Sequence, residues 1–454
     1  MKKKYGVFFG FAVLLIAALF TLAGCGDKDS GDPTSPSKND PPIEISTLAE
    51  LNAISTDAGN LSKNYKLMAD ITGPVTRPIG IASGTDFVGF TGEFDGNGHT
   101  ITVDIRDGLV VSEGELAGIY GGLFAGIVNR GLVHDLTVTG TVNITTSGSL
   151  NIYAGGVVAG MLQGGTVRKV TSAVNVTASN SGGSLYVVAG GIAGGARGAT
   201  VSDSYTTGAI SAAATGTNTG HLNVEAGGVG GAFLSGTVSH VYATGNVSAV
   251  ATGTYSDGHA QAGGVAGVIN TTSVLNAYAT GNVSASASSK VDARAGGAVG
   301  HFNDRGSVRY VYATGNVSVT ANGSGGRGCA GGVVGNLKDE GSVSNTVALN
   351  TSVSITGSSS NQQVHRVIGS IEDNGTRKDN YGKEDLTPTV TNGSYTPVKG
   401  ADKADGEDVA VTGGPPPSAY TAPDKDWWRE KGFKGADWNT VWQWDSTTGL
   451  PKLR

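Results

Sequence analysis

The sequence predicts an all-β protein: a right-handed parallel β-helix, or solenoid, of about eight repeats of about 35 residues each. Three observations support this prediction. Glycine supplies 74 of the 454 residues, more than twice its usual share of ~7%, while charged residues fall to 15%. Gly-Gly pairs recur at a nearly constant spacing, and between the pairs apolar residues alternate with small polar ones.

The same composition excludes several other classes of protein. The glycines follow no three-residue period, which excludes collagen, and no heptad pattern predicts a coiled coil. The net charge of -6 argues against a nucleic-acid partner, because phosphate binding needs a basic face.

Residues 1–24 are typical of an export signal, with lysines at the start and an apolar run from Val7 to Phe20. The sequence Leu-Ala-Gly-Cys that ends at Cys25 resembles the bacterial lipobox, which implies that Cys25 is lipidated and anchors the chain in a membrane. An ordinary cleaved signal peptide is the alternative. Residues 25–42 then have the composition of a disordered tether. The acidic residues after Cys25 resemble surface-export signals, so we expect an outer-membrane lipoprotein exposed on a bacterial cell surface.

Residues 43–120 are expected to form an N-terminal cap and the first coils. Thr47 and Glu50 have the spacing of a capping box and precede an apolar face of Leu48, Leu51 and Ile54, which predicts one short helix over the open first turn.

Residues 94–99 predict a strand, a tight turn and a second strand. Asp95, Asn97 and His99 suggest metal ligands, but turn chemistry accounts for the first two, and we expect no metal site.

Residues 121–374 contain the repeats. The Gly-Gly pairs begin at Gly121, Gly155, Gly190, Gly227, Gly263, Gly296 and Gly331. A valine series and the phrase Tyr-Ala-Thr-Gly-Asn-Val-Ser, complete at Tyr242, Tyr278 and Tyr312, keep the same spacing. Within a unit, the alternation of Leu222, Val224 and Ala226 is that of a strand with one buried face.

A unit of a few short strands cannot bury its apolar face alone, so each strand is expected to pair with its equivalent one repeat away. We expect one solenoid turn per repeat, although two smaller turns would also fit its length. The variation in repeat length is expected in polar loops such as 212–220 and 249–258.

The combination Ala-Gly-Gly-Val-x-Gly, Gly-x-Val and Tyr-Ala-Thr-Gly-Asn-Val resembles the GLUG motif of bacterial surface and secreted proteins. That family includes some peptidases of immunoglobulin A and haemagglutinin-like adhesins. The resemblance covers roughly residues 121 to 370 and implies a β-solenoid architecture. It implies no particular activity, because the motif is a structural unit.

The C-terminal part divides into an irregular linker, 375–425, and a cap, 426–454. The cap holds all five tryptophans of the chain within 18 positions. We expect these rings to plug the last turn of the solenoid; a sugar-binding aromatic platform is the alternative.

No catalytic residue, cofactor or metal is expected. Asp304 beside Asp339, with Arg305 beside Glu340, is a candidate acidic cluster, but a surface ion pair explains it equally well. The repeat alignment places Asp203 close to His240 in the next turn, so Asp203 has no acidic neighbour there. The glycosidases that have a β-helix fold need paired carboxylates. With Cys25 acylated, Cys329 has no partner for a disulfide.

The predicted function is that of a lipid-anchored adhesin, or a scaffold that binds a glycan or host matrix. The alternatives are a structural spacer without a ligand, and a polysaccharide-active enzyme or part of a secreted peptidase. We expect a monomer that is not an enzyme. Function is expected to lie in the polar loops, and the candidate ligand-contact residues are His221, Asn223, Tyr255, Asp257 and His259.

Overall fold

The structure is a computed structural model that describes residues 40–83, 86–183, 185–323, 325–372, 374–414 and 419–454. The expected signal peptide, the lipidation site Cys25 and most of the tether lie outside the described residues. Among the described residues, no helix combines the length and apolar character that a membrane crossing requires.

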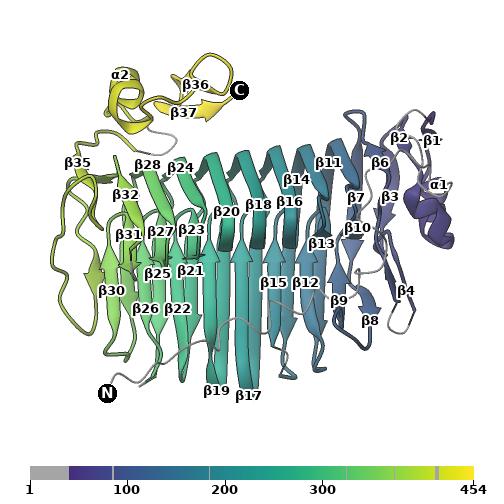
Figure 1. The fold of residues 1–454 in the computed structure, drawn as a ribbon, viewed down its shortest axis with the longest axis horizontal. Coiled ribbons are helices and arrows are strands. Elements are labelled where there is room, and N and C mark those ends of the chain that lie inside the picture. Colours follow the sequence, from purple (N-terminus) through teal and green to yellow (C-terminus); the bar gives the residue numbers. More distant parts are fainter. Residues whose placement is uncertain (1–39, 84–85, 184, 324, 373, 415–418) are drawn as a thin grey trace, which may run out of the picture.

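The protein is a rod whose turns stack along its long axis (Figure 1). Within the described residues, its main sheet has 33 strands, and each strand of the repeats pairs in parallel with its equivalent one repeat away. For example, β11 (Leu132–Thr146) pairs with β14 (Thr166–Asn180), with Val133 opposite Val167. Because the paired residues are one repeat apart, each repeat forms one turn. The predicted all-β solenoid is confirmed.

Four rows of strand segments make up the turns, and several long strands contribute to two rows. Row A leads into the Gly-Gly pairs and comprises β9 (Gly118–Gly121), β12 (Asn151–Gly155), β15 (Tyr186–Gly190), the second halves of β17 (Ile210–Gly227) and β19 (Val247–Gly263), β22 (Val291–Gly296), β26 (Gly328–Gly331) and β30 (Gln362–His365). Row B follows the pairs and comprises β10 (Phe124–Ile127), β13 (Val158–Leu162), the first parts of β16 (Ala193–Thr206), β18 (Gly230–Ala243) and β20 (Ala266–Ala279), β23 (Val299–Asn303), β27 (Val334–Leu337) and β31 (Ile368–Ile371).

Rows C and D complete each turn. Row C comprises β6 (Glu93–Asp95), β7 (Thr100–Ile105), the first parts of β11 and β14, the second parts of β16, β18 and β20, β24 (Ser307–Ala313), β28 (Ser342–Ala348), β32 (Thr376–Lys378), β33 (Tyr381–Lys383) and β35 (Glu407–Val409). Row D comprises the last parts of β11 and β14, the first halves of β17 and β19, β21 (Val283–Ala287), β25 (Val317–Ala321), β29 (Val353–Thr356) and β34 (Thr389–Val390).

The N-terminal end is capped as predicted. Helix α1 (Leu48–Ala53) begins with a capping box in which Thr47 and Glu50 satisfy each other's backbone N–H groups. Leu51 and Ile54 are fully buried in the main core. The remaining elements at this end are β1 (Ile43–Ile45), η2 (Ile54–Thr56), η3 (Ala58–Ser62), β2 (Tyr65–Leu67), β3 (Ile71–Val75), β4 (Ile81–Ser83), β5 (Asp86–Val88) and β8 (Leu109–Val111).

The last glycine of Ala-Gly-Gly-Val-x-Gly is required because the backbones of rows A and B touch. A Cβ atom on Gly300 would lie 2.6 Å from the carbonyl oxygen of Gly267 and 2.7 Å from that of Ala262. No other residue fits there without moving the backbone.

Row C contains a second repeated feature, a corner residue in the left-handed conformation with φ between 49° and 55°. Its members are Asp135, Lys169, Asp203, His240, Asn276, Tyr310, Asn345 and Asp379. None is glycine, although this conformation normally favours glycine or asparagine. Stacking between adjacent turns holds each corner in place. The predicted proximity of Asp203 and His240 is confirmed, with 3.2 Å between Oδ1 and Nδ1.

The predicted strand, tight turn and second strand at residues 94–99 are confirmed as β6, a turn and β7. The two strands do not pair with each other, because both pair in parallel with β11, so residues 96–99 are a solenoid corner. Two other local predictions were wrong. The expected polar loops 212–220 and 249–258 belong to β17 and β19, which pair with each other through these segments. Residues 375–425 are not simply a linker, because β32 to β35 extend the main sheet to Val409.

The tryptophan-rich segment does not plug the last turn. It consists of α2 (Lys425–Trp427), η4 (Trp428–Gly432), β36 (Trp442–Asp445) and β37 (Leu450–Leu453), and it lies against the side of the rod (Figure 1). Trp428 and Trp442 are fully buried in a second apolar cluster together with Tyr312. Aromatic residues of row C, which face outward, provide this docking surface.

Candidate functional site

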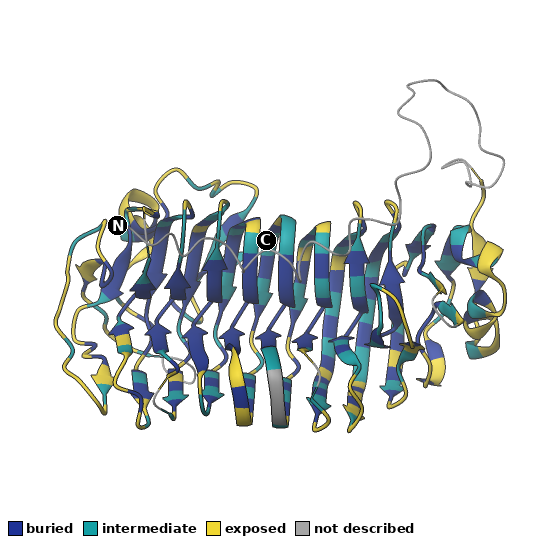
Figure 2. Ribbon diagram, turned by 60° about the horizontal axis from the view of Figure 1, so that its bottom comes forward, coloured by how far each residue is buried: buried dark blue, intermediate teal, exposed yellow. Residues whose placement is uncertain are grey.

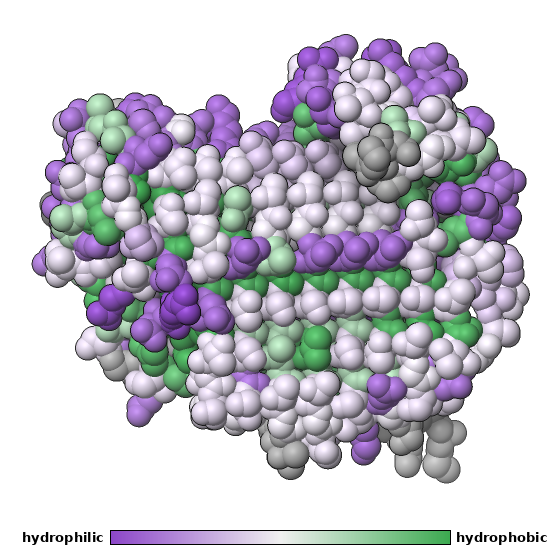
Figure 3. All heavy atoms as spheres, turned by 180° about the vertical axis from the view of Figure 1, so that it is seen from behind, coloured by the Kyte–Doolittle hydropathy of each residue, from purple (hydrophilic) through white to green (hydrophobic). Residues whose placement is uncertain are grey.

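A straight groove runs along the rod where row D begins. Figure 3 shows it as parallel rows of hydrophilic, hydrophobic and intermediate residues. Its volume is about 520 Å³. The lining comes from five successive turns: Asn175, Val176, Thr177, Ala209, Ile210, Ser211, Asn246, Val247, Ser248, Asn282, Val283, Ser284, Asn316 and Ser318.

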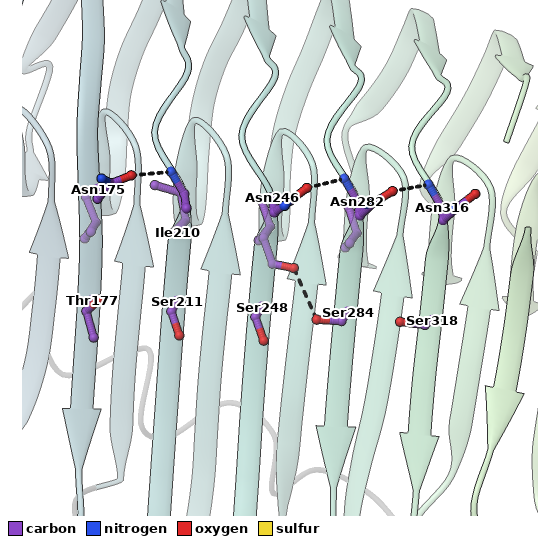
Figure 4. A pocket seen from close by; sticks show the side chains of 14 residues that line it. Asn175, Thr177, Ile210, Ser211, Asn246, Ser248, Asn282, Ser284, Asn316 and Ser318 are labelled. Atoms are coloured by element: carbon purple, nitrogen blue, oxygen red, sulfur yellow. Dashed lines mark hydrogen bonds between the residues drawn. The ribbon is translucent and has the colours of Figure 1, made fainter. Parts of the chain in front are cut away.

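The asparagines form one side of this groove (Figure 4). The side-chain oxygen of Asn246 accepts a hydrogen bond from the backbone N–H of Asn282 at 3.0 Å, and that of Asn282 accepts one from Asn316 at 2.9 Å. Each amide is thereby fixed in orientation while its residue stays exposed. An amide also carries two N–H donors, so the ridge presents such donors in four of the five turns; Ala209 takes the position in the remaining turn.

Hydroxyl groups form the other side of the groove, and buried aliphatic residues such as Ile210 and Val247 form its floor. Adjacent turns are about 4.8 Å apart, so the groove repeats the same aliphatic and hydroxyl chemistry at this interval, with an amide in every turn except that of Ala209. Such a surface can hold a polar chain that lies along the rod.

The second notable feature is a crease between the outer faces of rows A and B. In β17, Leu222, Val224 and Ala226 point into the core, so Asn223 and Glu225 lie on the outer face; both are nevertheless only 8% exposed. Row B lies over this face: a Cβ on Gly195 in row B would lie 3.5 Å from the ring of Tyr153 in row A. Figure 2 shows that the strands in the middle of the rod are mostly buried. The outer faces therefore enclose a strip of buried side chains outside the apolar core.

The character of the crease changes along the rod. Its N-terminal part is apolar: Tyr120 and Tyr153 stack with their ring centroids 5.3 Å apart. From Glu225 onward it is polar and charged. Row A contributes Glu225, His259, Gln261, Asp292, Arg294 and Cys329, and row B contributes His301, Asn336 and Ser370.

Ion pairs connect the charged groups of the crease. Asp292 accepts a hydrogen bond from Nη2 of Arg294 at 2.7 Å and another from the backbone N–H of Arg327 at 2.8 Å. Arg327 also donates to Glu372 at 2.5 Å, and Asn336 donates to the same carboxylate oxygen at 3.0 Å. Two guanidinium groups and two carboxylates thus balance one another within three turns.

Burial shifts the pKa values of the other titratable groups in the crease. It raises the pKa of the Glu225 carboxyl to about 8 and that of the Cys329 thiol to about 11. It lowers the pKa of His259 and of His301 well below the usual value, and the positive charge of Arg294 adds to the effect in both. At neutral pH Glu225 is therefore mostly protonated and both imidazoles are neutral.

Several buried polar atoms of the crease have no hydrogen-bond partner in the part of the chain that the structure describes. In row B they are Nδ1 of His301, Oδ1 of Asn336 and Oγ of Ser370, which occupy the same position in three successive turns. Sequence reasoning missed this row. The signal was present, because polar residues replace the Ala232 and Val268 of the preceding turns.

The predicted ligand-contact residues lie on strands β17 and β19 and divide into two groups. His221 and Asp257 are paired at 3.0 Å on the surface, and the ring of His221 meets that of His259 edge to face at 5.0 Å. His259 and Asn223 are opposite each other in the buried crease. Tyr255 is 3% exposed and packs in the main core, so its prediction as a contact residue was wrong.

The residues considered for metal binding or catalysis are engaged in ion pairs. His134 lies between Glu93, at 2.8 Å, and Asp135, at 2.6 Å. Together with the nearby Asp95, His134 and Asp135 form a set of three possible metal ligands. His99 instead contacts Asp70 at 3.2 Å. Both nitrogens of His134 already have carboxylate partners within hydrogen-bond distance.

The acidic cluster at the row B corners is a surface ion pair. Arg305 lies 3.5 Å from Glu340, and both side chains are 74% exposed. Asp304 and Asp339 occupy equivalent left-handed corners, which explains their regular spacing in the sequence.

A column of tyrosines on row C provides no free ring faces within the stack. The rings of Tyr205, Tyr242, Tyr278 and Tyr312 are 4.6 to 5.0 Å apart and within 6° of parallel. Trp428 and Trp442 pack on the C-terminal end of this column. Because sugars stack on ring faces, the column is unsuited to act as a sugar-binding platform.

The fold and the groove define a parallel β-solenoid with a repetitive polar surface. No family model matches the chain, and no curated protein matches it. Among solved structures, it is similar to one described as a "putative immunoglobulin A1 protease" from Bacteroides ovatus, with 15% sequence identity and a TM-score of 0.38. The similarity covers 91% of this chain and 92% of the other.

Proposed function

We propose that this protein is a lipid-anchored scaffold on a bacterial cell surface that binds an extended polar chain, such as a host or matrix glycan. The observation that carries the proposal is the groove formed by Asn175, Asn246, Asn282 and Asn316 and the facing hydroxyl groups. Amide and hydroxyl groups are the usual partners of sugar hydroxyls, and the groove has no charged residue in its lining.

A glycan suits the groove better than an extended peptide. A peptide advances about 3.3 Å per residue, which does not match the spacing of about 4.8 Å between turns. Its side chains would therefore fall out of phase with the asparagines. The lipid anchor at Cys25 would hold the rod at the membrane, and the groove would face outward along its length.

The test is a glycan array, together with host-matrix binding, using the purified full chain. We expect a polysaccharide or oligosaccharide to bind, and Ser248→Lys and Ser284→Lys to weaken it at least tenfold because the longer side chains fill the groove. Ser202→Lys and Ser239→Lys are matched controls, since these half-buried serines lie on β16 and β18 outside the groove.

Two results would contradict the proposal. Clean failure across glycans and matrix proteins would favour a structural spacer. Release of sugar or peptide products would favour an enzyme.

A further inference from the structure

A separate cavity of about 380 Å³ lies at the C-terminal end of the crease. Its walls come from β30, β31 and the segment from Val390 to Ala404. Gln363 is opposite Cys329 in the sheet, and Ser370 is opposite Asn336, so both continue the rows of the crease into the cavity. The cavity thus lies at the last turn of the crease, where the chain leaves space between rows A and B.

The outer wall of this cavity is held in place by one buried carboxylate. Asp405 is fully buried and accepts hydrogen bonds from the backbone N–H groups of Arg366 and Val398, both at 2.7 Å. Nδ1 of His365 lies 3.1 Å from the same carboxylate. The ring of Tyr395 meets that of His365 edge to face, with centroids 6.0 Å apart. The cavity is therefore preformed, which lowers the entropy cost of binding.

The lining combines polar and apolar residues and is almost uncharged. Gln362 and Gln363 supply amides, Ser394 and Thr396 supply hydroxyls, and His365 is paired with Asp405. Ser370 is 2% exposed, and its Oγ has no hydrogen-bond partner in the described chain. A volume of this size is at the small end of the range of about 300–1,000 Å³ for ligand sites.

Neutral amides and hydroxyls beside a tyrosine ring recognise a small ligand with many hydroxyl groups and no charge. We propose that this cavity binds one neutral sugar residue, such as the terminal hexopyranose of a glycan. This site is distinct from the row D groove and does not depend on it. The unpaired hydroxyl of Ser370 would gain a partner from the sugar, and Tyr395 would contact its less polar face.

The experiment measures binding of methyl glycosides of glucose, galactose, mannose and N-acetylglucosamine to the full chain by ligand-observed NMR. We expect at least one of them to bind, and Gln363→Ala and Ser370→Ala each to weaken it about tenfold. Ser370→Ala is expected to fold normally, because it removes a buried hydroxyl that has no partner. Val398→Trp, at the exposed rim, is expected to abolish binding by filling the entrance.

Gln443→Ala and Ser344→Ala are matched controls, since both residues are partly buried outside the cavity. The proposal is overturned if none of the four glycosides binds, or if binding is unchanged in both Ser370→Ala and Val398→Trp. A failure of the proposed glycan binding in the row D groove can be distinguished from a failure of this cavity proposal. Ser248→Lys alters the groove and should leave binding of these monosaccharides intact.

Discussion

The indole Nε1 of Trp442 donates a hydrogen bond to the side-chain oxygen of Asn276, 166 residues earlier in the chain, at 2.9 Å. Trp442 is fully buried, and Asn276 occupies one of the left-handed corners of row C. This contact joins the C-terminal segment to the side of the rod, three corners before Asp379, the last left-handed corner of row C.

We expect Trp442→Phe to release the C-terminal segment while the solenoid stays folded. The variant leaves the oxygen of Asn276 without its donor and opens space beside Phe433, at a cost of about 1–3 kcal/mol. Limited proteolysis should then cut within residues 420–454. Trp444→Phe is the control, because Trp444 is only partly buried. Equal protease resistance of both variants and the unmodified protein would show that this contact does not hold the segment.

Removing one partner of the buried Asp292–Arg294 pair should destabilise the solenoid strongly. The Arg294 side chain is 4% exposed, so Asp292→Asn leaves a buried charge without its carboxylate, at a cost of about 3–5 kcal/mol. Adding Arg294→Met should restore much of the loss. Urea unfolding of the two single variants and the double variant measures the coupling.

The exposed pair Arg305–Glu340 is the surface comparison for the buried Asp292–Arg294 pair. Arg305→Ala should change the unfolding free energy by less than about 0.5 kcal/mol, because surface pairs contribute little. If Asp292→Asn also changed the unfolding free energy by less than about 0.5 kcal/mol, the Asp292–Arg294 pair would behave as a surface pair, and water would have to reach the crease.

Glu225→Gln should stabilise the protein at alkaline pH and leave it unchanged in acid. The folded pKa of Glu225 is about 8 and the unfolded value is near 4.5, so only the unfolded state ionises between these pH values. Stability is therefore lost as pH rises from about 4.5 to about 8. The variant should be more stable by roughly 2–4 kcal/mol at pH 8, with no difference at pH 4.

Urea midpoints at pH 4, 6 and 8 measure this difference, and Glu340→Gln is the exposed control. A constant difference between Glu225→Gln and the unmodified protein at all three pH values would contradict the assigned burial of the carboxyl.

Gly300→Ala should prevent the close approach of rows A and B. The added Cβ would overlap the backbone of Gly267 and Ala262, which cannot move without separating the sheets, at a cost of about 1–3 kcal/mol or more. Thermal unfolding followed by circular dichroism measures the loss. Gly414→Ala should have little effect, because its Cβ would meet no atom within 4 Å. Equal melting temperatures for the two variants would refute the packing role of the motif glycine.

Much of the repeat architecture was predictable because every turn repeats the same local chemistry. The spacing of Val133 and Val167 equals one repeat, and these two residues are opposite each other in the sheet. The capping box at Thr47 was predictable because it depends on residues only three positions apart. The strands of residues 212–220 and 249–258 were not predictable from polarity, because pairing between adjacent turns satisfies their backbones whatever the side chains.

The candidate sites were predictable only in part. The structure brings His221, Asp257 and His259 together on paired strands, whereas the core position of Tyr255 depends on which face of β19 turns inward. The row of His301, Asn336 and Ser370 could not be recognised from sequence, because alternation marks these residues as outward and does not show that row A covers them.

The sequence by itself determined the all-β class, the turn of about 35 residues and the capped N-terminus, because each depends on local periodicity or short-range hydrogen bonds. Only the tertiary structure decided that rows A and B meet on their outer faces, that Asp292, Arg327 and Glu372 form one partly buried network, and that the tryptophans dock on the tyrosine column. These features depend on the angle between adjacent rows and on the path of the chain after Val409. Both are set by packing among residues far apart in the sequence, which leaves no periodic signal.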